Sequence, residues 1–365
     1  MQLTLPVVRL NCCLEPKCTA YPVGGFLRIS WVFIVMSCLC FPLACQAQRY
    51  VVASHLPFGG DQTYWDYLTS DAKTRRLYVT REKEVLILDL DSLKEVARIS
   101  GLKRAHGVAL AHDFNKGFIS DGGQNAVIVF DLASNSVTQT IPVGNAPDAI
   151  LYVPAKKWVY AFNAHSHNAS IIDPRTEKII ATVPLNGLPE FAVSDGNGAV
   201  FVNIEDKNTL VRLDADGTKV QNEWSLAPCK GPSGLAIDTR GRRLFSVCDN
   251  KYMIVTDADT GKQIAQIPVG KEPDAAIFDA ERKLVFASNC DGTLTVVKQE
   301  SPDKYTILQN LETEKEARTM ALDPASHRLF LPFEKLRPGQ KPPAPGTLPE
   351  FTPGTFQVLV VAPET

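Results

Sequence analysis

One short pattern recurs along the chain at intervals of about 40 residues, and this repeat constrains the fold more than any other feature. Its clearest copies are IPVGNAPDAILYVPAKKWVYAFN (Ile141–Asn163), VPLNGLPEFAVSDGNGAVFVN (Val183–Asn203) and IPVGKEPDAAIFDAERKLVFASN (Ile267–Asn289). Self-similarity at this period is typical of one supersecondary unit that packs against copies of itself. We count seven units, which begin near Thr63, Ala105, Ala146, Leu188, Gly231, Glu272 and Ala317.

Each unit is predicted to contain four short strands. Val, Ile, Leu and Phe alternate or cluster between turn residues, and this spacing is typical of strands rather than helices. In the second unit the predicted strands are Gly107–Ala111, Gly117–Ser120, Ala126–Asp131 and Val137–Ile141. Because a four-stranded unit cannot bury both faces alone, we predict radial packing. The expected fold is all-β, a seven-bladed β-propeller of four-stranded antiparallel blades.

The last unit lacks a strand of its own. It has three clear strands, of which the last ends in Thr355–Val361, and no fourth strand follows. Residues 49–56 can supply the missing outer strand, so we expect strands from both ends of the chain to close the ring. The mature chain, 48–365, is therefore predicted to be one domain.

Three phrases in the repeat resemble a known family. Leu77-Tyr78-Val79-Thr80, Val127–Asp131 and Ile141–Asp148 are similar to the YVTN family of β-propeller repeats of the exported bacterial type, and the third recurs at Ile267–Asp274. The resemblance covers residues 49–363 and implies a WD40-like propeller. It leaves function open, because relatives include exported proteins of unknown role, nucleic-acid binders, surface-layer proteins and distant haem and quinone enzymes. Covalent haem binding there needs Cys-x-x-Cys-His, which this sequence lacks.

Residues 1–47 have the features of a leader. Ile29–Ala44 carries no charge, follows an arginine and precedes Cys45-Gln46-Ala47, where small residues suit a signal peptidase. We expect a signal peptide with its hydrophobic region at 29–44, cleavage after Ala47, and an exported protein, periplasmic or extracellular, with no membrane span in the mature chain. The alternatives are an uncleaved anchor, lipid attachment at Cys45, and translation that starts downstream of Met1.

Six of the nine cysteines lie in this leader, and the mature chain keeps Cys229, Cys248 and Cys290. Export to an oxidising compartment permits a disulfide. We predict Cys229 with Cys248, because both fall near the same face of the fifth unit. The alternative pairing is Cys248 with Cys290, on neighbouring units.

Alignment of the units groups seven residues that no single motif connects. Each follows the proline of an IPVG-x-x-P phrase, or occupies the equivalent position, where the innermost strand opens. They are Asp66, His106, Asp148, Glu190, Ser233, Asp274 and Arg318. In a propeller these positions circle one mouth of the central channel, so we predict them as the ligand-binding residues of the loop face.

Four of these seven residues are carboxylates, which repel one another unless something compensates. Water or Arg318 can compensate, and a solvated polar rim remains one interpretation. A bound divalent cation compensates better: oxygen ligands suit Ca²⁺ or Mg²⁺, and a histidine admits transition metals. The candidate metal ligands are His106, Asp148, Glu190 and Asp274, and no cofactor is certain.

Two further features fall on the same face. His165 and His167 lie in the loop between the second and third strands of the third unit. If that loop is extended, both imidazoles point to one side and form a weak metal-ligand pattern. The second feature is a proline-rich insertion at 334–354, which we expect to cover the face.

The sequence favours binding over catalysis. Ser233 has no Gly-x-Ser-x-Gly context, and no phosphate-cradling loop is present. We predict an exported, monomeric, non-enzymatic scaffold that binds a small-molecule ligand or a protein partner through its loop face. The alternative is a metal-assisted lactonase or ester hydrolase of the propeller type. Nucleic acid is disfavoured, because the formal net charge is −2 and no basic stripe is visible.

Overall fold

The computed structural model describes residues 49–61, 64–340 and 349–364. The predicted leader, with its cleavage site after Ala47 and the alternative lipidation site at Cys45, lies outside the described residues. So do the unit start at Thr63 and residues 341–348 of the proline-rich insertion. Ala47–Thr365 is one compact unit.

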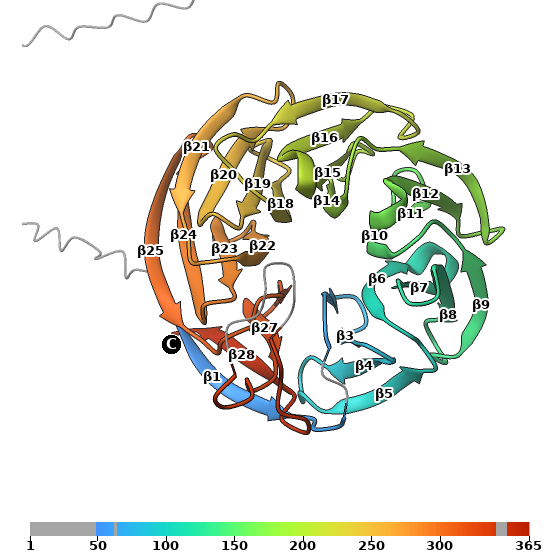
Figure 1. Ribbon diagram of the computed structural model, residues 1–365, viewed down its shortest axis with the longest axis horizontal. Helices are drawn as coiled ribbons and strands as arrows, with labels where there is room; N and C mark the ends of the chain where they lie inside the picture. The colour runs from blue at the N-terminus through green and yellow to red at the C-terminus, as the bar shows by residue number, and fades with distance from the viewer. Residues whose placement is uncertain (1–48, 62–63, 341–348, 365) are drawn as a thin grey trace, which may run out of the picture. The chain divides into compact units, whose positions relative to one another are not determined.

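The described strands form seven four-stranded antiparallel sheets around a central channel, which confirms the predicted fold (Figure 1). The first three blades, from the innermost strand outward, are β2 (Leu68–Asp71), β3 (Arg76–Arg81), β4 (Glu84–Asp89), β5 (Glu95–Ser100); β6 (Ala105–Ala111), β7 (Lys116–Asp121), β8 (Ala126–Asp131), β9 (Val137–Pro142); and β10 (Pro147–Val153), β11 (Trp158–Asn163), β12 (Asn168–Asp173), β13 (Lys178–Pro184).

The next three blades follow the same order. They are β14 (Pro189–Ser194), β15 (Val200–Ile204), β16 (Thr209–Leu213), β17 (Val220–Ser225); β18 (Pro232–Asp238), β19 (Arg243–Cys248), β20 (Tyr252–Asp257), β21 (Gln263–Pro268); and β22 (Pro273–Asp279), β23 (Leu284–Asn289), β24 (Thr293–Ser301), β25 (Lys304–Glu312).

The seventh blade joins the two ends of the chain. It consists of β26 (Ala321–Asp323), β27 (Arg328–Phe333), β28 (Gln357–Pro363) and, outermost, β1 (Tyr50–Pro57). β1 runs antiparallel to β28, with Tyr50 opposite Pro363 and Pro57 opposite Gln357. The predicted closure is confirmed, and it pairs the edge of β28 that would otherwise be open.

The core lies between neighbouring blades. Apolar runs in the middle strands are buried along nearly their whole length, as in β4 and β8. Tyr78 and Ile87 of the first blade, for example, pack in one cluster with Val108, Ile119 and Phe130 of the second. Because both faces of a blade meet a neighbour, its two central strands carry continuous apolar runs instead of strict alternation.

Two blades begin later than predicted. The innermost strands of the first and last blades start at Leu68 and Ala321, not near Thr63 and Ala317. The segments before these two strands bond to neighbouring blades: the Tyr67 amide donates to the His106 carbonyl at 3.0 Å, and the Thr319 hydroxyl donates to the Asp66 carbonyl at 2.8 Å.

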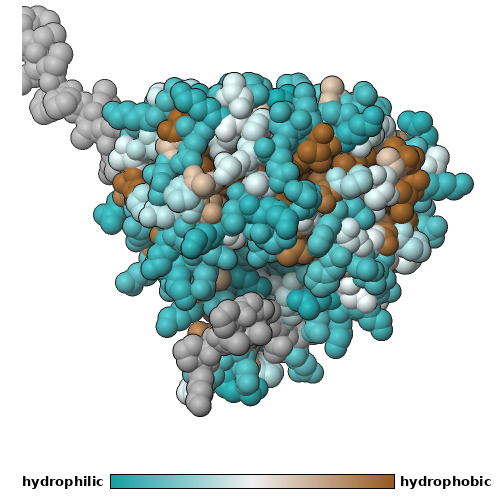
Figure 2. Space-filling model, turned by 45° about the horizontal axis from the view of Figure 1, so that its top comes forward, coloured by the Kyte–Doolittle hydropathy of each residue, from teal (hydrophilic) through white to brown (hydrophobic). Residues whose placement is uncertain are grey.

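The propeller has two faces, which differ in the strand connections that they carry. We call the side that carries the links from outer to next inner strand, and from second to third strand, the loop face; the opposite side is the turn face. The surface seen in Figure 2 is mostly hydrophilic, with hydrophobic residues in separate small groups. Within the described residues, no helix is both long and apolar enough to cross a bilayer.

The fifth blade holds a disulfide. Cys229 precedes β18 and Cys248 ends β19, and their sulfur atoms are 2.07 Å apart. Cys290 is the one free cysteine in the described part of the chain. Cys248 is therefore joined to Cys229 and not to Cys290 on the neighbouring blade.

Candidate functional site

The structure places all seven predicted site residues where the innermost strands open on the loop face. Five of them are the second residue of an innermost strand: His106, Asp148, Glu190, Ser233 and Asp274, in β6, β10, β14, β18 and β22. Asp66 and Arg318 lie a few residues before β2 and β26. Four of them are buried: Asp66, His106, Ser233 and Arg318 are at most 8% exposed. We call these seven residues the mouth ring.

Polar side chains of the preceding blade hold the backbone of the mouth ring in position. The Thr80 hydroxyl donates to the His106 carbonyl at 2.9 Å, and the Ser120 hydroxyl donates to the Asp148 carbonyl at 2.5 Å. Asn203 Nδ2 donates to the Ser233 carbonyl at 2.8 Å. These donors lie at the next-to-last position of their second strands, so the first, second and fourth blades each position the start of the next innermost strand.

Asp66, His106 and Asp148 form a compact cluster. His106 Nδ1 lies 2.6 Å from Asp66 Oδ2 and 3.3 Å from Asp148 Oδ1. The Tyr64 hydroxyl donates to Asp66 Oδ2 at 2.8 Å. One ligand atom from each of the three residues lies within 4.8 Å of the others, the spacing of a possible metal site. Of the predicted metal ligands, Glu190 and Asp274 are outside this group.

His106 is the positive member of the cluster. Burial alone lowers the pKa of its imidazole, but the adjacent carboxylates of Asp148 and Asp66 outweigh burial and raise that pKa to about 10. At neutral pH the ring is therefore protonated and donates from Nδ1 to a carboxylate. Any metal ion that binds Nδ1 must first displace this proton.

Glu190 is held from across the channel. The Tyr67 hydroxyl of the first blade donates to Glu190 Oε1 of the fourth blade at 2.7 Å. Burial, followed by the charges of Asp148 and Asp274, raises the pKa of Glu190 well above its ordinary value. A cation that neutralised these charges would lower that pKa and favour the ionised carboxylate.

Arg318 and Asp274 form an ion pair on the opposite side of the mouth. Arg318 Nε donates to Asp274 Oδ2 at 3.0 Å, and Nη2 donates to the Trp65 carbonyl at 3.3 Å. Burial raises the pKa of Asp274 to about 7, although Arg318 opposes this shift. Glu316 Oε2 is 3.9 Å from Nη1. Arg318 is therefore the counter-ion of an acidic group that burial makes difficult to ionise.

Ser233 has a different role from its neighbours in the ring. Its hydroxyl is buried and donates to the Pro273 carbonyl of the next blade at 2.6 Å. The side chain positions the backbone beside Asp274, so its hydrogen atom is not available to a ligand.

A pocket of about 550 Å³ opens beside the cluster. His106 and Asp148 form one wall, and Arg104, Asn125, Asn145 and His165 are among its other lining residues. His165 lies in η2 (Ala164–Ser166), and His167 caps that short helix in the left-handed region at φ 50°. The extended geometry assumed for the His-x-His segment is therefore wrong, because the loop forms a helical turn. His165 reaches the pocket, and His167 is not among its lining residues.

The described ends of the proline-rich insertion lie beside the same mouth. Phe351 is buried, and its ring centroid is 4.7 Å from that of Trp65. Arg337, Glu350 and Phe351 line a second pocket, of about 520 Å³, together with Tyr64 and Arg104. The described ends of the insertion therefore lie beside the mouth, and its covering role stays a prediction.

Sequence reasoning missed the aromatic residues that support the mouth ring. Tyr64 bonds Asp66, Trp65 lies under the Arg318 guanidinium at 5.2 Å, and Tyr67 bonds Glu190. A signal for Tyr67 was present in the alignment. The position after each ring residue is small or of moderate size in five blades, but it is Tyr67 in the first and Phe191 in the fourth.

Comparison with known proteins supports the fold and gives little on function. No family model matches the chain. The chain is 27% identical over 149 residues to the uncharacterized protein YncE of Salmonella typhi, and 26% identical over the same length to YncE of Salmonella typhimurium. Each match spans 39% of this chain and 42% of the relative, so the chain covers less than half the length of these relatives.

Solved structures resemble the chain over most of its length. The crystal structure of the RRP9 WD40 repeats matches with a TM-score of 0.73 and 9% identity, covering 87% of this chain and 99% of that one. The structure of U3-55K matches with a TM-score of 0.71 and 8% identity, covering 84% and 98%. At such low identity the likeness is one of fold alone.

Proposed function

We propose that this protein is an exported, non-enzymatic β-propeller of the YVTN type. It binds a positively charged ligand at the loop-face mouth of its channel. A divalent cation is the simplest such ligand. The observation that carries the proposal is the crowding of Asp66, Asp148, Glu190 and Asp274 around one mouth, with His106 and Arg318 as the positive members of the ring.

The electrostatics of the mouth favour a cation. Burial raises the pKa values of Glu190 and Asp274, so their ionised forms lack full compensation from solvent and from Arg318. Glu205 and Glu316 also have raised pKa values, again first because of burial, and the charges of Asp148 and Glu272 respectively add to them. A cation at the mouth replaces protons on such groups and stabilises the folded state by mass action.

Export and monomeric action remain part of the proposal. The signal-peptide pattern supports export, and the charge balance together with export disfavours nucleic acid as a partner. The two pockets beside the mouth, lined by Arg104, His165 and the insertion, give a ligand or protein partner room to extend beyond the cation.

One observation favours a second candidate, a metal-assisted lactonase or ester hydrolase. The spacing of Asp66, His106 and Asp148 suits a metal ion that polarises an ester carbonyl. Turnover of a panel of lactones and esters by the metal-loaded protein would support this candidate, and loss of that turnover in Asp148→Asn would assign it to the mouth.

Thermal unfolding tests the proposed function. Millimolar Ca²⁺, Mn²⁺ or Zn²⁺, added separately, is expected to raise the melting temperature of the wild type. The double variant Asp148→Asn with Asp274→Asn should lose this increase, whereas the control Asp216→Asn with Glu312→Gln, which changes two exposed carboxylates, should keep it.

Without ions, the double variant should have a melting temperature close to that of the wild type. Removing two carboxylates relieves repulsion, and this gain offsets the loss of a partner for His106 and for Arg318. If no ion shifts the wild-type transition, the cation version is wrong. If the double variant is markedly less stable without ions, the mouth ring is a structural feature.

A further inference from the structure

The channel contains a second cavity, on the side of Tyr67 away from the mouth ring. It has a volume of about 360 Å³ and lies among the innermost strands of the first, fourth, fifth, sixth and seventh blades. The Tyr67 and Phe191 rings form its floor, edge to face with centroids 4.9 Å apart. Since the Tyr67 hydroxyl bonds Glu190, these two aromatic residues separate the acidic mouth from this cavity.

The cavity opens toward the turn face. A wider space of about 530 Å³ shares Thr69, Ser70, Phe191, Val193 and Ile237 with it. That space continues past Asp71, Ser194 and Pro154, which end or follow innermost strands on the turn face. The two spaces therefore form one funnel, wide at the turn face and narrow at Tyr67.

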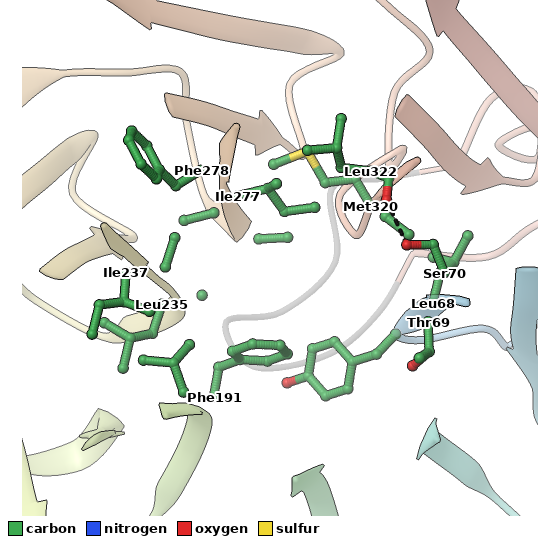
Figure 3. A pocket seen from close by; sticks show the side chains of 17 residues that line it. Leu68, Thr69, Ser70, Phe191, Leu235, Ile237, Ile277, Phe278, Met320 and Leu322 are labelled. Carbon is green, nitrogen blue, oxygen red and sulfur yellow. Dashed lines mark hydrogen bonds between the residues drawn. The ribbon is translucent and has the colours of Figure 1, made fainter. Parts of the chain in front are cut away.

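The walls of the inner cavity are apolar. Figure 3 shows Phe191, Leu235, Ile237, Ile277, Phe278, Met320 and Leu322 around it, contributed by several blades. Several of these side chains, including Phe191, Ile237 and Phe278, are half-buried rather than packed away. The mouth ring, at the other end of the channel, carries carboxylates, so the two ends of the channel differ in chemistry.

The side-chain hydroxyl groups that line the inner cavity already have partners. The Thr69 hydroxyl donates to the Val108 carbonyl at 2.7 Å, and the Ser70 hydroxyl donates to the Leu322 carbonyl at 2.5 Å (Figure 3). Asp71 and His112, whose carboxylate and imidazole are 3.0 Å apart, line the outer space and not the inner cavity. A polar ligand would lose its hydrogen bonds to water here without regaining them.

We propose that this cavity binds one small, uncharged, largely apolar molecule, such as an aromatic compound or the end of a hydrocarbon chain. Its volume lies near the lower end of the range of small-molecule pockets, roughly 300–1,000 Å³. The occupant is a small molecule, because the apolar side chains line the inside of the funnel as far as Tyr67. The surface of a protein partner that docks on the turn face would not reach them. The site is distinct from the proposed cation site, because no mouth-ring residue lines the cavity and Tyr67 and Phe191 lie between them.

A matched pair of fluorescent probes tests both the site and the class of ligand. N-phenyl-1-naphthylamine is uncharged, and 8-anilino-1-naphthalenesulfonate has the same ring system with a sulfonate. We expect the full chain to bind one uncharged probe saturably, and to bind it about tenfold or more tightly than the sulfonate, because burying an unpaired charge is costly.

Two variants and two controls locate the bound probe. Ile237→Glu places a charge in the funnel and Val193→Phe fills it, so each should weaken binding of the uncharged probe about tenfold or more. The controls Ile180→Glu and Val220→Phe make the same changes at exposed positions on β13 and β17 and should bind like the wild type. Melting curves identify any variant that fails to fold, and the second funnel variant then decides.

Three results would overturn the proposal. The first is the lack of saturable binding by the wild type. The second is equal affinity for the two probes, or equal loss of binding in the funnel variants and the controls. The third is a wild-type dimer in sedimentation that Ile237→Glu dissociates, because a second copy would then occupy the funnel. Saturating divalent cation should leave the affinity for the uncharged probe unchanged. Probe binding is also expected if the proposed cation site fails its own test, so the two proposals can fail separately.

Discussion

At the scale of single residues, one strand position gives the mouth its chemistry. The repeat places seven residues at the same level of the channel, and sequence variation there produces a protonated histidine between two carboxylates, a glutamate tied to Tyr67, and an arginine paired with Asp274. Burial makes these groups interdependent, because the pKa of each depends on the charges of the others.

We predict that the protein without added ions loses stability as the pH rises from about 5 to about 9. Asp274 has a folded-state pKa of about 7, and His106 one of about 10; both exceed the ordinary values. In each case the folded state holds the proton more tightly, so this stability is present at low pH and is lost as the pH rises through the folded-state pKa. Melting temperatures across this range measure the effect.

Asp274→Asn separates the two groups. It should make the decline between about 5 and 7 shallower, although Glu190, Glu205 and Glu316 also have raised pKa values and keep part of it. The decline between about 7 and 9, to which His106 contributes, should remain. The control Asp216→Asn, at an exposed turn, should keep the wild-type profile. A wild-type melting temperature that rises with pH across this range would contradict the assignment.

At the scale of elements, the strand at the start of the described chain closes the ring. β1 covers β28 along its length, and Tyr50 also bonds the sixth blade: its amide donates to Gln309 Oε1 and its carbonyl accepts from Gln309 Nε2, both at 2.9 Å. The Tyr50 ring packs edge to face on Phe286, with centroids 5.0 Å apart. β1 therefore links the sixth and seventh blades.

Deleting Tyr50–Pro57 should lower the melting temperature by about 10 °C or more, because it removes a whole strand and exposes the edge of β28. Differential scanning calorimetry measures this change. Gln309→Ala, which removes only the side-chain bonds to Tyr50, should cost no more than about 2–4 °C. An unchanged transition in the deletion variant would refute the role given to β1.

The elements were predictable to different degrees, for physical reasons. The repeat predicted the number of blades and the closing strand. Each blade needs four strands to pack against its neighbours, so the missing fourth strand of the last unit could be recognised from the sequence. The segments before β2 and β26 bond to neighbouring blades through the Tyr67 amide and the Thr319 hydroxyl, and a helical turn moves His167 away from the pocket. The repeat pattern predicts neither feature. The mouth ring followed from alignment, whereas the reach of Tyr67 to Glu190 depends on a contact 123 positions away in sequence.

At the scale of the whole propeller, the channel has two ends of opposite character. Carboxylates, His106 and Arg318 surround the loop-face mouth, whereas an apolar inner cavity opens toward the turn face, with Tyr67 and Phe191 between them. A ring of blades brings residues far apart in the sequence to one axis, so two sites with different lining residues can share one channel, joined by the bond from Tyr67 to Glu190. We propose that the loop-face mouth is the site of cation binding.

Calorimetric titration of the full chain with Mn²⁺, in two buffers of different ionisation enthalpy, tests that proposal most directly. We predict one ion bound per chain with release of protons at about pH 6.5, because His106 and Asp274 are then largely protonated, and we predict no binding to the Asp148→Asn, Asp274→Asn variant. Binding that releases no protons, or that survives in the double variant, would contradict cation binding at the mouth ring.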